Sequence, residues 1–469
     1  MNPTFIIYNM FNNTRDVQNR LEQRLDLSII PGKSLGWFRL GTSIWDVINF
    51  LRKQSRVIPS VDLKYTDESP ITTDLFLSLS VNGIHLRFDG STQRLKMIEV
   101  YDFSKLRLTY QDSEVSSSKV APTFLSIYKI FGPTYPGELD SSTNEYTLNY
   151  PGVSFVFPIP EKHVSLYISS SDLPLELPDG TSPILSRLYT FHGSNFRTSV
   201  VPPLTRGANS ESVGSGSGEI GEIESVIAEL KRGVTINFYD RNNSNKISKE
   251  ILLNVTTAQD LLVDIGSALR IFYKEEDKMR IHSEDISSID NVDSRVNGKN
   301  VLSNGVTGRN REGDAGHPID YFYNYFHLGF DVLFDGMTHR CKKIILHGNV
   351  PGHYDFQRFK RCPYKILIHS KVNSIPDMTN EIARLEVFDE EEEEDNQKPS
   401  SMQNGVAYIS AEMKIDKINE LLGPPTGRPL IYNRGAGGQN PFGPTELSGY
   451  DGAVFEVMKN GHVATITLF

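Results

Sequence analysis

A helical stripe of apolar residues occurs four times in this chain of 469 residues, and it constrains the fold more than any other feature. In each stripe apolar side chains recur three and four residues apart, the spacing that places them on one face of a helix. The stripes begin near residues 43, 122, 257 and 415. Ser43 and Thr257 are suitable N-caps, and Gly-Pro follows the second and fourth stripes, so several helix ends are marked as well.

Segments with alternating apolar and polar residues follow each stripe, and such alternation predicts strands with one buried face. Two of these strands end in the same tripeptide, Phe88-Asp89-Gly90 and Phe334-Asp335-Gly336. Near the C-terminus, Asn460-Gly461 predicts a hairpin with a type I′ turn. The sequence therefore predicts an α+β fold of four quasi-repeated units, each one helix plus an antiparallel β-meander, arranged in two halves.

The composition along the chain predicts where the halves begin and end. We expect a flexible N-terminal extension over residues 1–24, a first half over 25–202 and a second half over 223–469, each half with two units. Residues 203–222 have the composition of a linker, and residues 283–316 and 386–405 are expected to be disordered insertions. The second insertion holds seven consecutive acidic residues, Asp389 to Asp395, which should remain solvated, although they could contact a basic partner.

Charge and cysteine content exclude several classes of protein. There are 48 basic and 58 acidic residues, a net charge of −10, which argues against a surface built for nucleic acid. Cys341 and Cys362 are too few for a disulfide scaffold or a four-cysteine zinc site. No run approaches the roughly 18 apolar residues of a membrane span. We therefore expect a soluble, cytoplasmic protein.

Catalytic signatures are weak. Residues 216–221 match the G-x-G-x-x-G pattern, but a Ser-rich linker precedes them where a phosphate site needs a strand. Six histidines lie between His317 and His369, without the helical spacing of a metal pair, and structural roles are the simpler interpretation. We therefore predict no catalytic residue, no metal and no cofactor.

One segment is strongly basic. Between His339 and Lys371, eight cations stand against the single acid Asp355, giving +7, and aromatic residues are interleaved. This pattern suits a membrane interface or an acidic partner. The alternative is a solvated strand face whose charges pair with acids elsewhere. The candidate interaction surface consists of Arg340, Lys342, Lys343, Arg358, Lys360, Arg361 and Lys365.

Long stretches of the chain resemble the phagosome assembly factor family. They are LDLSIIPGKSLG from Leu25, the run from Tyr65 to Tyr110, FGPTYPG, YKEEDKMRIHS, the run from Asp320 to Phe356, NPFGPT and the closing FEVMKNGHVATITLF. The resemblance covers nearly the whole chain from about Leu25 onward. The chain departs from the family by its N-terminal extension, the 283–316 insertion and the acidic run.

The resemblance implies a non-enzymatic autophagy adaptor. Such a protein would pair with a WD-repeat β-propeller partner, which recognises phosphoinositides, and would be recruited to the phagophore assembly site as a peripheral cytoplasmic component. Two alternatives remain open. One is a Golgi or endosomal trafficking factor that binds acidic lipid directly through the basic segment. The other is an enzyme or small-molecule binder that uses a concave sheet face.

Overall fold

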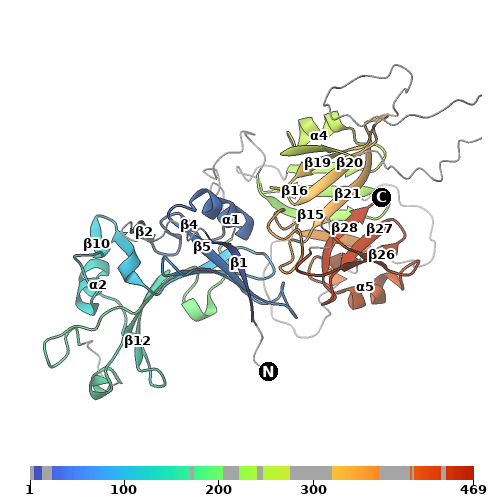
Figure 1. Ribbon diagram of the computed structural model, residues 1–469. Coiled ribbons are helices and arrows are strands. Elements are labelled where there is room, and N and C mark those ends of the chain that lie inside the picture. The colour runs from blue at the N-terminus through green and yellow to red at the C-terminus, as the bar shows by residue number, and fades with distance from the viewer. Residues whose placement is uncertain are drawn as a thin grey trace, which may run out of the picture.

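The computed structural model describes residues 5–12, 24–168, 174–203, 221–239, 247–274, 319–368, 402–403, 406–434 and 440–469. These residues form four β-sheets and five α-helices (Figure 1). Most of the expected 203–222 linker and of the 386–405 insertion, and all of the 283–316 insertion, lie outside the described residues. Within the expected extension, residues 5–12 form a strand. The proposed domain limits stay predictions.

Residues 5–203, here called the N-terminal part, form two of the sheets. The larger sheet has, in spatial order, β1 (Phe5–Asn12), β5 (Ser60–Thr66), β6 (Leu75–Leu79), β7 (Ile84–Phe88), β8 (Leu95–Val100), β14 (Arg187–Phe191), β13 (Val153–Pro158), β12 (Glu145–Tyr150) and β11 (Glu138–Asp140). The smaller sheet has β10 (Ser113–Ser116), β9 (Leu106–Tyr110), β2 (Leu25–Ile30), β3 (Ser34–Leu35) and β4 (Phe38–Arg39).

Residues 221–469, the C-terminal part, form the other two sheets. The six-stranded sheet has β17 (Ile247–Leu252), β16 (Gly233–Phe238), β15 (Ile223–Glu229), β22 (Tyr364–Ile368), β24 (Val406–Ser410) and β23 (Met402–Gln403). The eight-stranded sheet has β18 (Arg270–Tyr273), β19 (Tyr321–Tyr325), β20 (Phe330–Phe334), β21 (Cys341–His347), β28 (Val463–Leu468), β27 (Ala453–Val457), β26 (Thr445–Tyr450) and β25 (Leu430–Tyr432).

The helices are few and short. They are α1 (Ile44–Lys53), α2 (Phe124–Phe131), α3 (Ser165–Ile168), α4 (Ala258–Asp264) and α5 (Ile415–Leu422), with 3-10 turns η2 (Phe103–Lys105), η3 (Glu161–His163) and η4 (Phe196–Thr198). Four of them begin where the apolar stripes predict. Ser43 caps α1 by accepting from the Asp46 amide, and Thr257 caps α4 by accepting from the Asp260 amide.

The predicted α+β fold of four helix-plus-meander units is nevertheless wrong. Strand residues greatly outnumber helical residues, and the sheets join strands from different expected units: β8 of the first unit pairs with β14 of the second. Two pairs, β2 with β9 and β15 with β22, are parallel, which a set of meanders does not contain. The fold is mostly β because extended pairing between distant segments, rather than a local repeat, buries the apolar faces.

Local structure does recur at the two Phe-Asp-Gly strand ends. Asp89 accepts from the amide of Thr92, and Asp335 accepts from the amide of Thr338. Each turn then meets a helix start, because the residue after the turn forms an isolated bridge to the N-cap of α1 or α4. The tripeptide therefore marks a turn that fixes a helix N-terminus.

The C-terminal hairpin forms, but its turn is not the predicted type I′ turn. Gly461 has a positive φ of 81°, whereas Asn460 is not among the residues with positive φ. The Gly461 amide donates to the Met458 carbonyl and the Met458 amide to the His462 carbonyl, so the loop is longer than two residues. Asn460 instead donates from its side chain to the Asp67 carbonyl of the N-terminal part, at 2.7 Å.

Each part has its own apolar core, and a small separate cluster joins them. The small cluster contains Ile71 from the N-terminal part with Val350, Met458 and Ala464 from the C-terminal part. Beside it the buried side chains of Gln93 and Asn349 meet: Gln93 donates to the Asn349 carbonyl at 2.7 Å and accepts from the Asn349 amide group at 2.8 Å. The two parts therefore share a packed junction, with α1 on one side of it (Figure 1).

Candidate interaction surfaces

Lys360, expected on a basic surface, lies in the junction. Its Nζ is 3.2 Å from Asp46 Oδ2 and 2.6 Å from Glu222 Oε1, and Arg94 contacts the other oxygen of Glu222 at 2.7 Å. Burial alone would raise the pKa of Glu222, but Lys360 and Arg94 outweigh it and lower that pKa to about 2. We call these four residues the junction ion cluster. It links the two parts through two cross-junction ion pairs.

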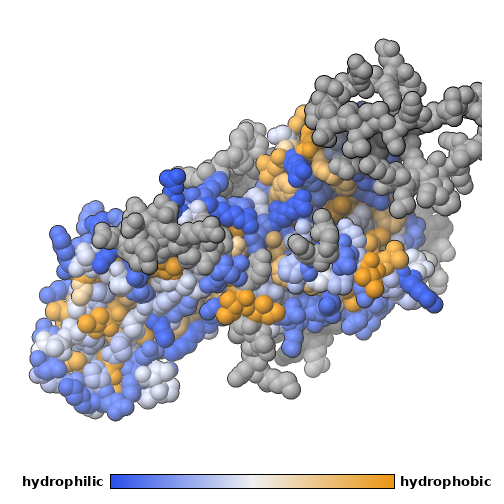
Figure 2. Space-filling view, viewed as in Figure 1, coloured by the Kyte–Doolittle hydropathy of each residue, from blue (hydrophilic) through white to orange (hydrophobic). Residues whose placement is uncertain are grey.

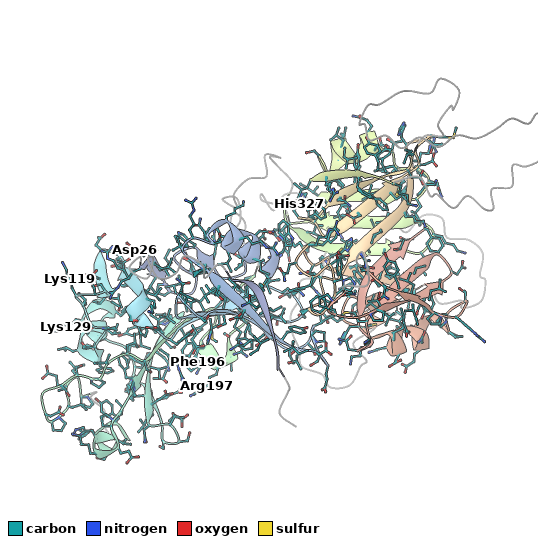
Figure 3. The ribbon with its side chains drawn as sticks, in the orientation of Figure 1. Asp26, Lys119, Lys129, Phe196, Arg197 and His327 are labelled. Atoms are coloured by element: carbon teal, nitrogen blue, oxygen red, sulfur yellow. The ribbon has the colours of Figure 1, made fainter. Side chains whose placement is uncertain are left out.

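His327 borders this cluster and is labelled in Figure 3. Its Nδ1 is buried without a hydrogen-bond partner in the described structure. Burial lowers the pKa of His327, and the nearby Lys360 lowers it further. The imidazole is therefore held neutral beside the junction.

Arg358 and Arg361 also serve the protein itself. Arg361 donates to the carbonyls of Gly348 at 2.8 Å and Ala411 at 3.5 Å, and burial lowers its pKa. Arg358 lies 3.2 Å from Asp355, and its guanidinium stands over the ring of Phe359. The side chain of Arg358 is half exposed. Neither cation is simply a free surface charge.

The other four basic residues of the candidate surface lie in separate places. Lys342 pairs with Asp320 and Asp335 at 3.0 and 2.8 Å, and Arg340 donates to the Asn254 carbonyl. Lys343 in β21 lies over the ring of Phe469, and Lys365 in β22 lies over that of Tyr408. The seven candidates are thus divided between the junction, two sheets and local acids. Whether any of them binds a partner stays a prediction.

His347 and both cysteines of the C-terminal part are buried. His347 Nε2 is 2.9 Å from Asp331 Oδ2, and its ring stacks on Phe359 with centroids 3.5 Å apart. Burial raises the pKa of both thiols, Cys341 and Cys362, to about 12. No group of three His, Cys, Asp or Glu side chains suited to a metal ion occurs among the residues that the structure describes.

An exposed apolar surface, which sequence reasoning missed, lies at α4 and the edge strand β18. We call it the apolar edge and define it by Leu262, Val263, Leu269, Ile271, Phe272 and Tyr273, with exposures from 42% for Phe272 to 75% for Val263. Orange and blue atoms adjoin at this end of the C-terminal part in Figure 2. Alternation of Leu269, Ile271 and Tyr273 is the signal that could have predicted a strand here.

The described residues define a mostly β protein of large, mainly antiparallel sheets joined at a packed junction. Its sequence belongs to the phagosome assembly factor 1 family, whose model matches residues 34–295 and 307–469, which confirms the resemblance. In the described parts of the chain no helix has the length and apolarity that a membrane crossing requires.

The chain is similar to named PHAF1 proteins from plants and animals. One from Arabidopsis thaliana is 32% identical over 94% of this chain and 92% of its own length. One from Drosophila melanogaster is 31% identical over 95% of this chain and 94% of its own length, and one from Caenorhabditis elegans 28% over 92% and 90%. No solved structure matches the chain. Membership of this family supports an autophagy-related role.

Proposed function

We propose that this chain is an autophagy adaptor that binds a WD-repeat β-propeller protein and is recruited with it to the phagophore assembly site. Family membership along nearly the whole chain is the observation that carries the proposal. In this view the chain is cytoplasmic and peripheral to the membrane. The propeller, rather than this chain, contacts phosphoinositides.

We also propose that the chain acts without catalysis. Its two thiols are buried with pKa values near 12, so they are not poised as nucleophiles at neutral pH. The carboxylate of Glu222 is held by two cations, and Glu456 is held by Arg434 and His353. These arrangements support structural rather than chemical roles for the buried ionisable groups.

The test removes the propeller gene and follows the fluorescently tagged chain in starved cells. The chain should lose its puncta and become diffuse while its abundance, measured by immunoblot, stays unchanged. Re-expression of the propeller should restore the puncta. Puncta that persist without the propeller would refute the adaptor role. Strong pelleting of the purified chain with phosphatidylinositol 3-phosphate vesicles would instead favour direct lipid binding.

A further inference from the structure

The side of β18 that faces away from β19 has no strand partner among the residues that the structure describes. Among the described strands β18 pairs only with β19, at one end of the eight-stranded sheet. The Lys274 amide donates to the Asp320 carbonyl at 2.9 Å, and hydrogen-bonded pairs alternate along an antiparallel ladder. Phe272 therefore faces β19 with its amide, whereas the amides of Ile271 and Tyr273 face the open edge. An extended chain placed there would find donors and acceptors ready.

Two other edge strands of this protein, β17 and β11, carry acidic side chains, whereas the charges at β18 are the cations Arg270 and Lys274 at its two ends. Charged side chains occupy β17, with Lys249 and Glu250, and β11, with Glu138 and Asp140. Such charges discourage the approach of another strand. The three side chains between Arg270 and Lys274 are apolar or aromatic and well exposed, Tyr273 to 61%.

An added strand would bury apolar surface on both faces of the sheet. Ile271 and Tyr273 stand beside Tyr323 and Tyr321, on the face that leads into the core of the C-terminal part. Phe272 stands on the opposite face, beside Phe322 in the ladder. Apolar side chains at alternating positions of a guest strand would cover each set in turn.

Cations at the two ends of β18 define the charge of the guest. Arg270 and Lys274 are both exposed, and neither forms an ion pair with an acid in the described parts of the chain. We propose that the open edge of β18 binds an extended segment of a partner protein by strand addition, with apolar residues at alternating positions and an acidic residue at each end. This inference rests on the proposed function, since an adaptor must hold a partner.

The experiment measures binding of a synthetic peptide to the purified full chain by fluorescence anisotropy. The probe is a labelled, end-blocked Glu-Val-Tyr-Val-Ile-Val-Asp, compared with the same peptide N-methylated at alternate amides. Binding should weaken by at least about tenfold on N-methylation, because the backbone contacts are lost. No binding of the first peptide, or equal binding of both, would overturn the proposal.

Variants locate the contact. Ile271→Pro removes an edge-facing N–H without removing a bond to β19, and Ile271→Lys adds a protective charge; both should weaken binding about tenfold or more. Ile431→Lys on β25, the opposite edge strand of the same sheet, is the matched control and should bind normally. Equal loss in this control would overturn the assignment to β18. Melting curves should confirm that each variant is folded.

A charge-reversal variant provides an independent test that leaves the strand intact. The double variant Arg270→Glu, Lys274→Glu should reject the acidic probe and accept a probe with lysine at both ends. Unchanged preference would refute the stated guest chemistry. Vesicle binding that depends on Ile271, without peptide binding, would assign the edge to a membrane and overturn strand addition. Because these measurements use the purified chain, peptide binding can fail even if the puncta depend on the propeller. Peptide binding can likewise succeed even if the puncta do not depend on the propeller.

Discussion

Lys360 holds carboxylates on both sides of the junction, so its replacement by methionine probes how the two parts are joined. The side chain of Lys360 is only 15% exposed, and Lys360→Met removes the charge between Asp46 and Glu222 while keeping most of the apolar stem. Breaking a buried ion pair costs about 3–5 kcal/mol. Arg94 still neutralises Glu222, and both acids keep some solvent contact, so we expect a loss near 2 kcal/mol.

The pKa of Glu222 supports the size of this effect. A fall from 4.5 to about 2 in the folded chain corresponds to roughly 3 kcal/mol of net stabilisation, which remains after Lys360 and Arg94 have outweighed the cost of burying the carboxylate. Because the folded pKa is the lower one, this stabilisation is present above about pH 4.5 and is lost as the pH falls toward 2. The difference between the parent chain and Lys360→Met should therefore be full at neutral pH and disappear in acid.

A tryptophan at the junction provides the assay. The chain has two tryptophans, and Trp45 Nε1 donates to the Arg358 carbonyl at 3.2 Å. In a Trp37→Phe background, urea unfolding followed by fluorescence reports the surroundings of Trp45 alone. Lys343→Met is the matched control, because that lysine is exposed, and it should change stability by less than about 0.5 kcal/mol. If Lys360→Met shifts unfolding no more than this control, the junction role of Lys360 is refuted.

Three further predictions concern buried groups. Phe334→Ala should cost about 3–5 kcal/mol in urea unfolding because Phe334 is fully buried, whereas Met337→Ala, at a site 71% exposed, should cost less than about 0.5; equal losses would contradict the core assignment. The two cysteines, with pKa values near 12, should resist iodoacetamide at about pH 8 until the chain unfolds, as mass spectrometry would show. Gly152→Ala should lower the melting temperature clearly, because φ is +80° and the new Cβ would lie 2.2 Å from the backbone nitrogen of Gly32; an unchanged melting temperature would refute that reasoning.

Helix positions could be predicted from the sequence because they depend on neighbours three and four residues away. Ile44, Val47, Ile48 and Leu51 are all buried on one face of α1, as their spacing requires. The capping side chain of Ser43 lies in the same short stretch. The residues that determine the position of such a helix therefore all lie within one short stretch of the sequence.

Sheet order could not be predicted in the same way, because strand alternation records only that one face is buried. It does not identify the neighbouring strand. Leu188 in β14 pairs with Val100 in β8, across 88 residues, and the parallel pairing of β15 with β22 joins segments still farther apart in the chain. The local pattern of helices and meanders therefore predicted four units, but the pairing of distant strands does not follow those units.

The charges show why the interaction surface could be predicted only in part. A run of cations in the sequence contains no information about acids distant in the chain, and Asp46, which pairs with Lys360, lies more than 300 residues away.

The same limit applies to the apolar edge. Ile271 and Ile344 both follow strand patterns, yet Ile344 is fully buried between β20 and β28, while Ile271 is 48% exposed at the end of the sheet. The difference comes from how many strands flank each residue, which is a property of the assembled sheet, so open edges of this protein had to be found in its structure.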